Sequence, residues 1–315
     1  MKIVKDLNKI VYDKKSAVTV GTFDGVHLGH REIIRKLNAV KDSKGLRSVI
    51  ITFEPHPQIV LRNREHDIRI LSTLNEKLEI FSELGIDMVC VINFTKEFSL
   101  TPAEKFYKDY LIDKIGLTDL ILGYDHMFGK NREGNFDTLK VLSGKYDFKV
   151  DKVEEYKPDG NHISSTVIRH LLEEGNIEKA GKLLGRSYSF EGIVVKGKKL
   201  GREIGFPTAN IQIDDEYKFV PKTGIYATEV MIGKEKYYGM MNIGTNPTVT
   251  DDTSIKIEVN IFNFNKDIYG EKIRVYLKNY IREEKKFKSL EELMENIYGD
   301  KKAILKLKNN RKINQ

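Results

Sequence analysis

Apolar and polar positions follow two different patterns along the chain, and the pattern changes near residue 185. Before that point, short apolar runs at residues 17–20, 48–53 and 88–92 alternate with segments whose apolar residues recur at helical spacing. One such helical face, which Gly85 ends, carries Leu74, Leu78, Phe81 and Leu84. Strands that alternate with helices predict an α/β fold: a parallel sheet covered on both faces, with binding loops at the carboxyl ends of its strands.

After residue 185 the period of the pattern changes to two, which is typical of half-buried strands. The alternating segments, separated by turns, are residues 188–195, 225–232, 237–243, 255–264 and 273–277. About six antiparallel strands in all predict a small closed barrel. A helix should then lie across the barrel, because Ser289 and Glu292 form a capping box ahead of an apolar face that includes Leu290. The basic residues 301–312 are expected to fray.

We therefore expect two domains, residues 1–184 with a Rossmann-like parallel sheet and residues 185–315 with an antiparallel β-barrel and a C-terminal helix. At 315 residues and 40% hydrophobic content, the chain can bury two cores. The single cysteine, Cys90, lies in an apolar run, which excludes an internal disulfide and favours a reducing compartment. No run approaches the roughly 18 apolar residues of a membrane span, and no signal-peptide pattern occurs. We expect a cytoplasmic protein with no membrane partner.

The net charge of +7 favours polyanionic partners. Nucleic acid and small polyanions such as ATP both satisfy that condition. The lysines are scattered rather than striped, and no RNA-binding signature occurs, so we expect small-molecule substrates and no nucleic-acid partner. The oligomeric state stays open.

Residues 21–30 (GTFDGVHLGH) lie between an apolar strand and an amphipathic helix. Tight turns at Gly21 and Gly25 would leave the free N–H groups of the new helix facing outward, which is a phosphate-binding arrangement. His27 and His30 bracket a glycine, so both imidazoles can stabilise charge that develops on a phosphate. A pair of surface or capping histidines is the ordinary alternative. The candidate ATP-binding residues of this loop are Gly21, Phe23, Asp24 and Gly25.

This stretch resembles the H-x-G-H nucleotidyltransferases, a family in which a substrate attacks the α-phosphate of a nucleoside triphosphate without a covalent enzyme intermediate. A second stretch, residues 163–169 (ISSTVIR), resembles the signature of their flavin adenylyltransferase branch. The resemblance implies that Ser164, Ser165 and Arg169 hold the triphosphate, although serines at a helix start are also ordinary N-caps. The two motifs occur in the order expected for that branch.

Two further loops follow predicted strands and so should meet the first loop at one cleft. Residues 54–57 (EPHP) leave a strand rigidly, because two prolines forbid a helix. Residues 123–129 resemble the family's G-x-D/N-F-x-F-G loop, except that His126 replaces the commoner phenylalanine and ring stacking there is not implied. The candidate flavin contacts from these loops are Phe53, Pro55, His56, Pro57 and Asp125.

Residues 201–210 (GREIGFPTAN) resemble the riboflavin kinase signature G-R-x-x-G-F-P-T-A-N and match it at every defined position. Thr208 and Asn210 are two apart, so in an extended strand their oxygens point the same way and can hold Mg²⁺ with its phosphates. The resemblance also implies ATP contacts for Gly201 and Arg202. A rigid Phe-Pro entry into a strand is the ordinary alternative.

Glu258 alternates with Ile257 and Val259 in a predicted strand, so it lies on the opposite face. A solvated strand charge is the ordinary interpretation. The resemblance to the kinase family implies instead that Glu258 is the general base.

Two positions near Glu258 depart from the kinase pattern: Asn260 stands where a histidine or another ring is common, and Asn263 where aspartate is usual. Neither position has a chemical role in the resemblance. Residues 282–292 resemble the family's helix entry and offer Arg282 and Phe287 as candidate flavin contacts.

Together the resemblances cover nearly the whole chain in the order of the bacterial bifunctional riboflavin kinase/FAD synthetase family. They imply that ATP, with Mg²⁺, phosphorylates riboflavin to FMN, and that FMN then attacks the α-phosphate of a second ATP to give FAD and pyrophosphate. Two alternatives stay open. One is a flavin-binding or regulatory protein that kept the folds and lost one activity, and the other is a nucleotidyltransferase that acts on another substrate.

Overall fold

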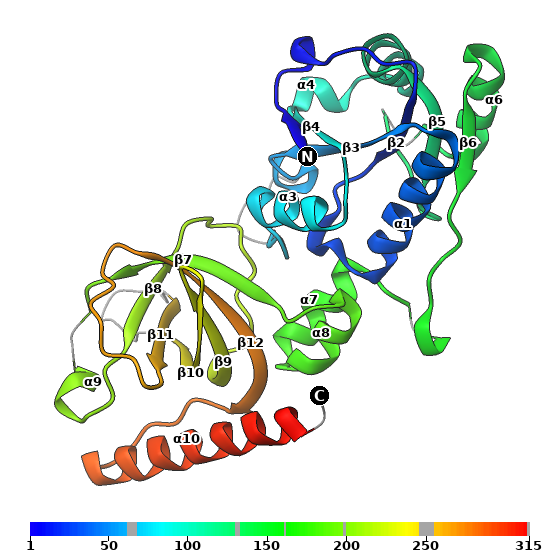
Figure 1. Ribbon diagram of the computed structural model, residues 1–315. Coiled ribbons are helices and arrows are strands. Elements are labelled where there is room, and N and C mark those ends of the chain that lie inside the picture. The colour runs from blue at the N-terminus through cyan, green and yellow to red at the C-terminus, as the bar shows by residue number, and fades with distance from the viewer. Residues whose placement is uncertain (62–67, 130–132, 161, 198–199, 246–254, 314–315) are drawn as a thin grey trace. The chain divides into compact units, whose positions relative to one another are not determined.

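The computed structural model describes residues 1–61, 68–129, 133–160, 162–197, 200–245 and 255–313. The chain forms two compact units, Met1–Ser165 and Thr166–Gln315 (Figure 1). The functional boundary expected between residues 184 and 185 stays a prediction. Among the described residues, no helix is both long enough and apolar enough to cross a membrane.

The first unit is built on a six-stranded sheet with the order β1-β4-β3-β2-β5-β6, in which every neighbouring pair is parallel. Its strands are β1 (Lys2–Val4), β2 (Ser16–Val20), β3 (Arg47–Glu54), β4 (Met88–Asn93), β5 (Leu117–Leu122) and β6 (Lys149–Lys152). The predicted parallel sheet is therefore confirmed. The strand order reverses at β2, whose neighbours are β3 on one side and β5 on the other, and ligands bind at such switch points.

Helices cover both faces of this sheet. Successive residues of a strand point to opposite sides, so each buried strand contributes to two cores. Ile50 of β3 belongs to the core under α1 (Leu28–Lys44) and α3 (Leu74–Glu83), whereas Ile51 belongs to the core under the helices that follow β4. The second group comprises α5 (Ala103–Phe106), the π-helical segment Tyr107–Ile115 and α6 (Phe136–Tyr146). Two short helices, α2 (Pro57–Leu61) and α4 (Lys96–Ser99), follow strands β3 and β4.

The second unit is a closed barrel with the strand order β10-β11-β8-β7-β12-β9, and all its pairs are antiparallel (Figure 1). Its strands are β7 (Ser189–Val195), β8 (Ala209–Ile213), β9 (Gly224–Ile232), β10 (Glu235–Thr245), β11 (Ile255–Ile261) and β12 (Lys272–Arg282). This unit also contains α8 (Ile177–Leu184) and all of α7 (Ser165–Glu173) except its first residue. The short helix α9 (Leu200–Glu203) is a single turn.

The last helix, α10 (Leu290–Ile313), packs against the barrel's outer surface through Ile297 and Ile304, which contact Met240 and its neighbours. The expectation of a frayed tail at residues 301–312 is wrong, because Ile304 is buried at 1% exposure and the helix continues to Ile313. Leu290, expected to face the barrel, is instead 53% exposed, since the apolar face of the helix begins one turn later.

Candidate active sites

The loop between β2 and α1 has three residues in the left-handed region of backbone space: Phe23 (φ 51°), Gly25 (φ 78°) and Val26 (φ 38°). A β-branched residue such as Val26 is strained there. A Cβ added at Gly21 would lie 3.0 Å from the Phe23 ring, so only glycine lets that ring fold back. The backbone thus turns tightly through a 3₁₀ segment, Asp24–Val26, before α1 begins at Leu28.

His27 is the N-cap of α1, and its Nδ1 accepts a hydrogen bond from the backbone N–H of His30 at 3.3 Å. Because Nδ1 accepts, the neutral tautomer of the ring carries its proton on Nε2, which is then a donor. The His27 and His30 rings stack with centroids 3.7 Å apart, and the Phe23 edge contacts His30 at 5.3 Å. His27 is therefore a cap, as the ordinary alternative predicts, and the same contact orients both imidazoles at the helix N-terminus.

Asp24 anchors the loop from inside the unit, where it is only 2% exposed. Its Oδ1 accepts hydrogen bonds from the backbone N–H groups of Leu71 and Ser72, at 2.8 and 3.1 Å. Its carbonyl accepts a bond of 2.9 Å from the hydroxyl of Ser165. The second sequence motif therefore reaches the first through Ser165. Arg169, further along α7, lies in the second unit, and its triphosphate contact stays a prediction.

A cavity of about 520 Å³ opens beside this loop at the switch point of the sheet. Its walls include Gly21, Phe23, His30, Phe53, Pro57, Asp125 and His126. Phe53 and Phe128 form a parallel aromatic pair in the wall, with centroids 5.8 Å apart. Of the other candidate flavin contacts, Pro55 and His56 do not line the cavity, because His56 is buried and its Nδ1 accepts the N–H of Gln58 at the start of α2. The peptide bond between Glu54 and Pro55 is cis.

His126, the departure from the family's phenylalanine, forms a polar contact in this wall: its Nε2 lies 2.8 Å from the hydroxyl of Tyr107. Burial lowers the pKa of His126 from 6.5 to about 4, although a hydrogen bond to the backbone of Val20 opposes the shift. The ring is therefore neutral at physiological pH. Sequence analysis missed Tyr107, which lies in a π-helical segment without local motif.

We expect the His126→Phe variant to be less sensitive to acid than the wild type. The folded pKa of His126 lies below its unfolded value, so the stability it contributes is present above pH 6.5 and is lost as the pH falls toward about 4. Between about pH 7 and about pH 5, the free energy of unfolding should fall by about 1–2 kcal/mol more in the wild type than in the variant. Melting curves at the two pH values measure this difference. Equal pH dependence in the two proteins would contradict the lowered pKa.

A polar row crosses three adjacent strands on the barrel's outer face. Glu258 of β11 lies directly opposite Asn242 of β10 on one side and Asn210 of β8 on the other. Its strand neighbours Ile257 and Val259 are buried in the barrel interior, as the alternation predicts. The register thus brings the predicted general base next to one predicted metal ligand.

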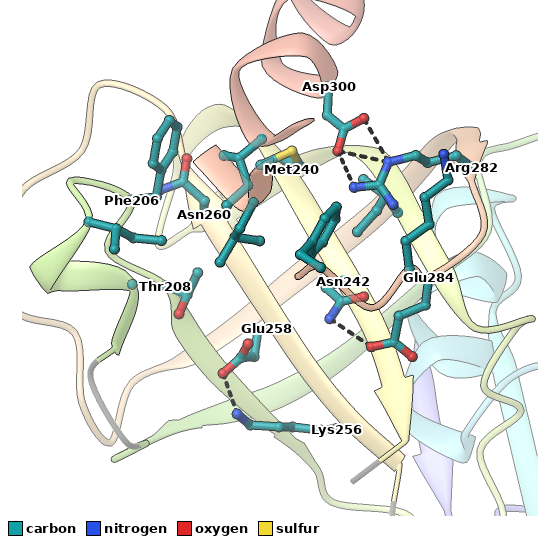
Figure 2. Close-up of a pocket in the computed structure, with 17 residues that line it drawn as sticks. Phe206, Thr208, Met240, Asn242, Lys256, Glu258, Asn260, Arg282, Glu284 and Asp300 are labelled. Atoms are coloured by element: carbon teal, nitrogen blue, oxygen red, sulfur yellow. Dashed lines mark hydrogen bonds and ion pairs between the residues drawn. The ribbon is translucent and has the colours of Figure 1, made fainter. Parts of the chain in front are cut away.

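A cavity of about 350 Å³ lies over this row, between the barrel and α10 (Figure 2). The polar lining residues include Thr208, Asn242, Lys256, Glu258, Asn260, Arg282, Glu284 and Asp300, and the apolar ones include Ile225, Met240, Phe287, Leu293 and Ile297. Glu258 forms an ion pair of 2.6 Å with Lys256, and Arg282 is held by two oxygens of Asp300 from α10, the shortest contact being 2.8 Å. The Arg282 guanidinium lies 5.7 Å from the Phe287 ring centroid, and both side chains line the cavity.

A second cavity of about 370 Å³ adjoins the first, and Thr208 lines both. Its other walls include Arg202, Pro207, Asp267 and Tyr269. Gly201 lines the first cavity, and a Cβ there would lie 2.3 Å from the carbonyl oxygen of Phe206, so glycine allows the signature loop to close. Asn210 lines neither cavity, and its amide packs against Gly197.

Both departures from the kinase pattern have a structural basis. Asn260 is 7% exposed, and its Nδ2 donates to the carbonyl of Pro207 at 2.7 Å, which fixes the signature loop on β11. Asn263 has φ 57°, a left-handed conformation that asparagine tolerates better than most residues. Asn260 therefore lines the cavity beside Glu258 while it holds the signature loop, and Asn263 suits the left-handed turn at its own position.

Several side chains of the barrel site had no predicted role, among them Lys256, Asn242 and Asp300. Lys256 could have been found, because it stands two residues before Glu258 and so shares its strand face. Asn242 and Asp300 had no local signal, since their strand register and the α10 packing bring them to the site.

Comparisons with known proteins match both halves of the chain. The family model described as FAD synthetase matches residues 9–167, and the one described as riboflavin kinase matches residues 184–308. The protein named bifunctional riboflavin kinase/FMN adenylyltransferase from Listeria monocytogenes is 37% identical over 94% of this chain and 91% of its own. Its namesake from Bacillus subtilis is 36% identical, over 93% and 92%.

Among solved structures, one described as a macrolide-efflux protein from Streptococcus pneumoniae is similar over almost the full length. The two chains are 33% identical and superpose with a TM-score of 0.87. The match covers 96% of this chain and 97% of the other. A chain that contains both a sheet unit and a barrel unit therefore has a solved counterpart.

Proposed function

The chain belongs to the family of bifunctional riboflavin kinases/FMN adenylyltransferases, which phosphorylate riboflavin to FMN and adenylylate FMN to FAD, and we propose how its residues divide the two reactions. Residues 1–184 carry FAD synthesis and residues 185–315 carry FMN synthesis. The observation that carries the proposal is that each sequence motif lines, or directly supports, a cavity of its own unit.

In FAD synthesis, a phosphate oxygen of FMN attacks the α-phosphorus of ATP, and pyrophosphate leaves on the opposite side. His27 and His30 donate hydrogen bonds to the oxygens on which charge develops, and stacking fixes both rings beforehand. Gly21, Phe23, Asp24 and Gly25 shape the loop that approaches the phosphates. Ser164, Ser165 and Arg169 hold the triphosphate and so align it for in-line displacement.

The flavin of FMN occupies the 520 Å³ cavity of the first unit. Phe53 and Pro57 supply apolar surface, and Asp125 supplies a polar edge. Pro55 and His56 shape the loop rather than contact the ring, because His56 is buried at the start of α2.

In FMN synthesis, the ring of riboflavin lies in the 350 Å³ cavity against Phe287 and Arg282. ATP lies in the neighbouring cavity with Arg202 in its wall, and Gly201 contacts it from the first cavity. Thr208 lines both cavities, which supports phosphoryl transfer at that point. Glu258 removes the proton of the 5′-hydroxyl as the hydroxyl oxygen attacks the γ-phosphorus, and ADP leaves.

Mg²⁺ is part of this proposal. The described residues contain no cluster of three histidine, cysteine or carboxylate side chains that could hold a metal ion. Thr208, which lines both cavities, and Asn210, which lies opposite Glu258 but lines neither, offer uncharged oxygens that fit an ion that keeps phosphate and water ligands. When bound, Mg²⁺ neutralises charge on the phosphates of ATP. Both reactions consume ATP, which supports the expected cytoplasmic location and small-molecule substrates.

Incubating the protein with riboflavin, ATP and Mg²⁺ and separating the flavins tests the function. We expect FMN to appear first and FAD to follow. A flavin-binding protein without activity would retain riboflavin unchanged, and a nucleotidyltransferase for another substrate would make neither product. Either of those results would contradict the proposal.

Fragments test the proposed boundary. A fragment of residues 166–315 should phosphorylate riboflavin, and so should one of residues 185–315, because the polar row and its cavity lie beyond residue 184. The shorter fragment should melt several degrees lower, since it loses the buried Leu172, Ala180 and Leu184 of α7 and α8. Loss of kinase activity in both soluble fragments would show that the site needs the first unit.

A further inference from the structure

A buried lysine lies beneath the phosphate-binding loop of the first unit. Lys77 belongs to α3, which begins with a complete capping box between Thr73 and Glu76, and its side chain is 3% exposed. Its Nζ lies 3.2 Å from the carbonyl oxygen of Thr22 and 3.5 Å from the hydroxyl of Thr52. Burying an ammonium group is costly and an apolar residue would fill the same space, so its retention calls for a specific interaction.

The loop that Lys77 contacts needs external support. Phe23, Gly25 and Val26 all have left-handed backbone conformations, and such strain persists only where the surroundings enforce it. The Thr22 carbonyl, just before these residues, accepts hydrogen bonds from both Lys77 and the Thr52 hydroxyl, the latter at 3.3 Å. These bonds hold one end of the loop, while Asp24 holds its centre.

Helix α3 touches the loop a second time, one turn further on. The Phe81 ring contacts Phe23 edge-on at 5.7 Å, and Phe23 in turn contacts His30 at 5.3 Å. His30 stacks on His27 at 3.7 Å. Contiguous packing therefore links the helix that carries Lys77 to both imidazoles.

Two carboxylates act on the charge of the Lys77 amine, Asp24 from the 3₁₀ turn and Glu54 from the end of β3. Burial lowers the pKa of Lys77 from 10.5, and the charges of Asp24 and Glu54 oppose that shift without reversing it. Lys77 should therefore lose its charge at a lower pH than an exposed lysine does.

We propose that Lys77 is a positioning residue for FMN adenylylation: its ammonium group holds the Thr22 carbonyl and thereby fixes the loop that presents His27 and His30. This inference rests on the proposed role of the two histidines. Lys77 itself touches no substrate. Its effect is to keep the phosphate-binding geometry formed before ATP arrives.

The test uses the full-length protein and measures FAD formation from supplied FMN beside FMN formation from riboflavin. We expect Lys77→Met to lower kcat for FAD formation by about 10²-fold, the usual consequence of a small misplacement at a reacting centre. FMN formation on the same chain should stay within about twofold of the wild type, since it uses the other unit. Lys77→Arg keeps the charge and should retain at least a tenth of the wild-type rate. Its rate should therefore be about tenfold higher than that of Lys77→Met.

Leu78→Ala is the matched control, because Leu78 lies beside Lys77 on α3, is buried and belongs to the apolar core. It should lower the melting temperature, yet leave FAD formation near the wild-type rate at temperatures where the protein stays folded. If Leu78→Ala and Lys77→Met had similar melting temperatures and lost FAD formation equally, the inference would be overturned. Lys77 would then contribute only to the stability of the fold. FAD formation within twofold of the wild type in Lys77→Met would also overturn it.

The pH profile of FAD formation gives a second readout that does not depend on the methionine variant folding. The wild-type rate should fall on the alkaline side as Lys77 loses its proton, and in Lys77→Arg this fall should move to higher pH. Identical alkaline limbs in the two proteins would overturn the inference. A wild type that makes no FAD at any pH would instead refute the proposed function, so the two failures are distinguishable.

Discussion

Replacing His27 or His30 is expected to lower FAD synthesis by about 10²–10³-fold, because each imidazole is an oriented donor to charge that develops at the α-phosphate. His27→Asn is the sharper variant. Asparagine is a good N-cap, so it can keep the bond that His27 Nδ1 accepts from the His30 N–H while it removes the imidazole. We therefore expect the melting temperature of His27→Asn to change little while its FAD synthesis is lost. His30→Ala tests the second ring.

His170→Ala is the matched control for the histidine variants. His170 lies on α7 with its side chain 70% exposed, close to Glu173 and Glu174 at the surface. We expect its FAD synthesis to equal that of the wild type. If His27→Asn and His30→Ala both kept FAD synthesis within about twofold of the wild type, the histidines would be capping and packing residues only.

Glu258→Gln is expected to lower riboflavin phosphorylation by about 10²–10⁴-fold, because glutamine keeps the size of the side chain but cannot take the proton of the 5′-hydroxyl. Riboflavin binding should persist, since Phe287, Met240 and Ile297 still line the cavity. The variant also loses the ion pair with Lys256. That loss should cost little stability, because the Lys256 side chain is 40% exposed.

Glu229→Gln is the matched control on the same barrel. Glu229 also forms ion pairs with two lysines, Lys236 and Lys278, but it lines neither cavity. We expect its kinase rate to match that of the wild type. An unchanged kinase rate in Glu258→Gln would show that Glu258 is a solvated strand charge, and equal losses in both variants would point to a general effect on the barrel.

The fold classes could be predicted from the sequence because each unit has a clear period. Alternation of strands and helices predicts the parallel sheet, and the period of two after residue 185 predicts the barrel. The exact ends of α10 could not be predicted in this way. Its basic C-terminal half hides the buried Ile304, and its first turn exposes Leu290, because tertiary packing rather than local pattern decides which turns meet the barrel.

Side chains that reach a site from outside the sequence motifs were the hardest to predict. Lys77 carried a weak signal, since it stands three residues after Leu74 and four before Phe81 and so falls on the apolar face of its helix. Asp300 carried none, because only the packing of α10 brings it to Arg282. By contrast, Glu258 and Thr208 reach one cavity from separate motifs, as strand register and loop closure allow.

The central claim is that one chain holds two separate sites, one for each half-reaction. The most direct measurement supplies riboflavin or FMN separately to His27→Asn and to Glu258→Gln and follows both products. We predict that His27→Asn makes FMN from riboflavin at the wild-type rate but almost no FAD, and that Glu258→Gln makes FAD from supplied FMN at the wild-type rate but almost no FMN from riboflavin. If either variant, still folded, lost both half-reactions together, the account of two independent sites would be contradicted.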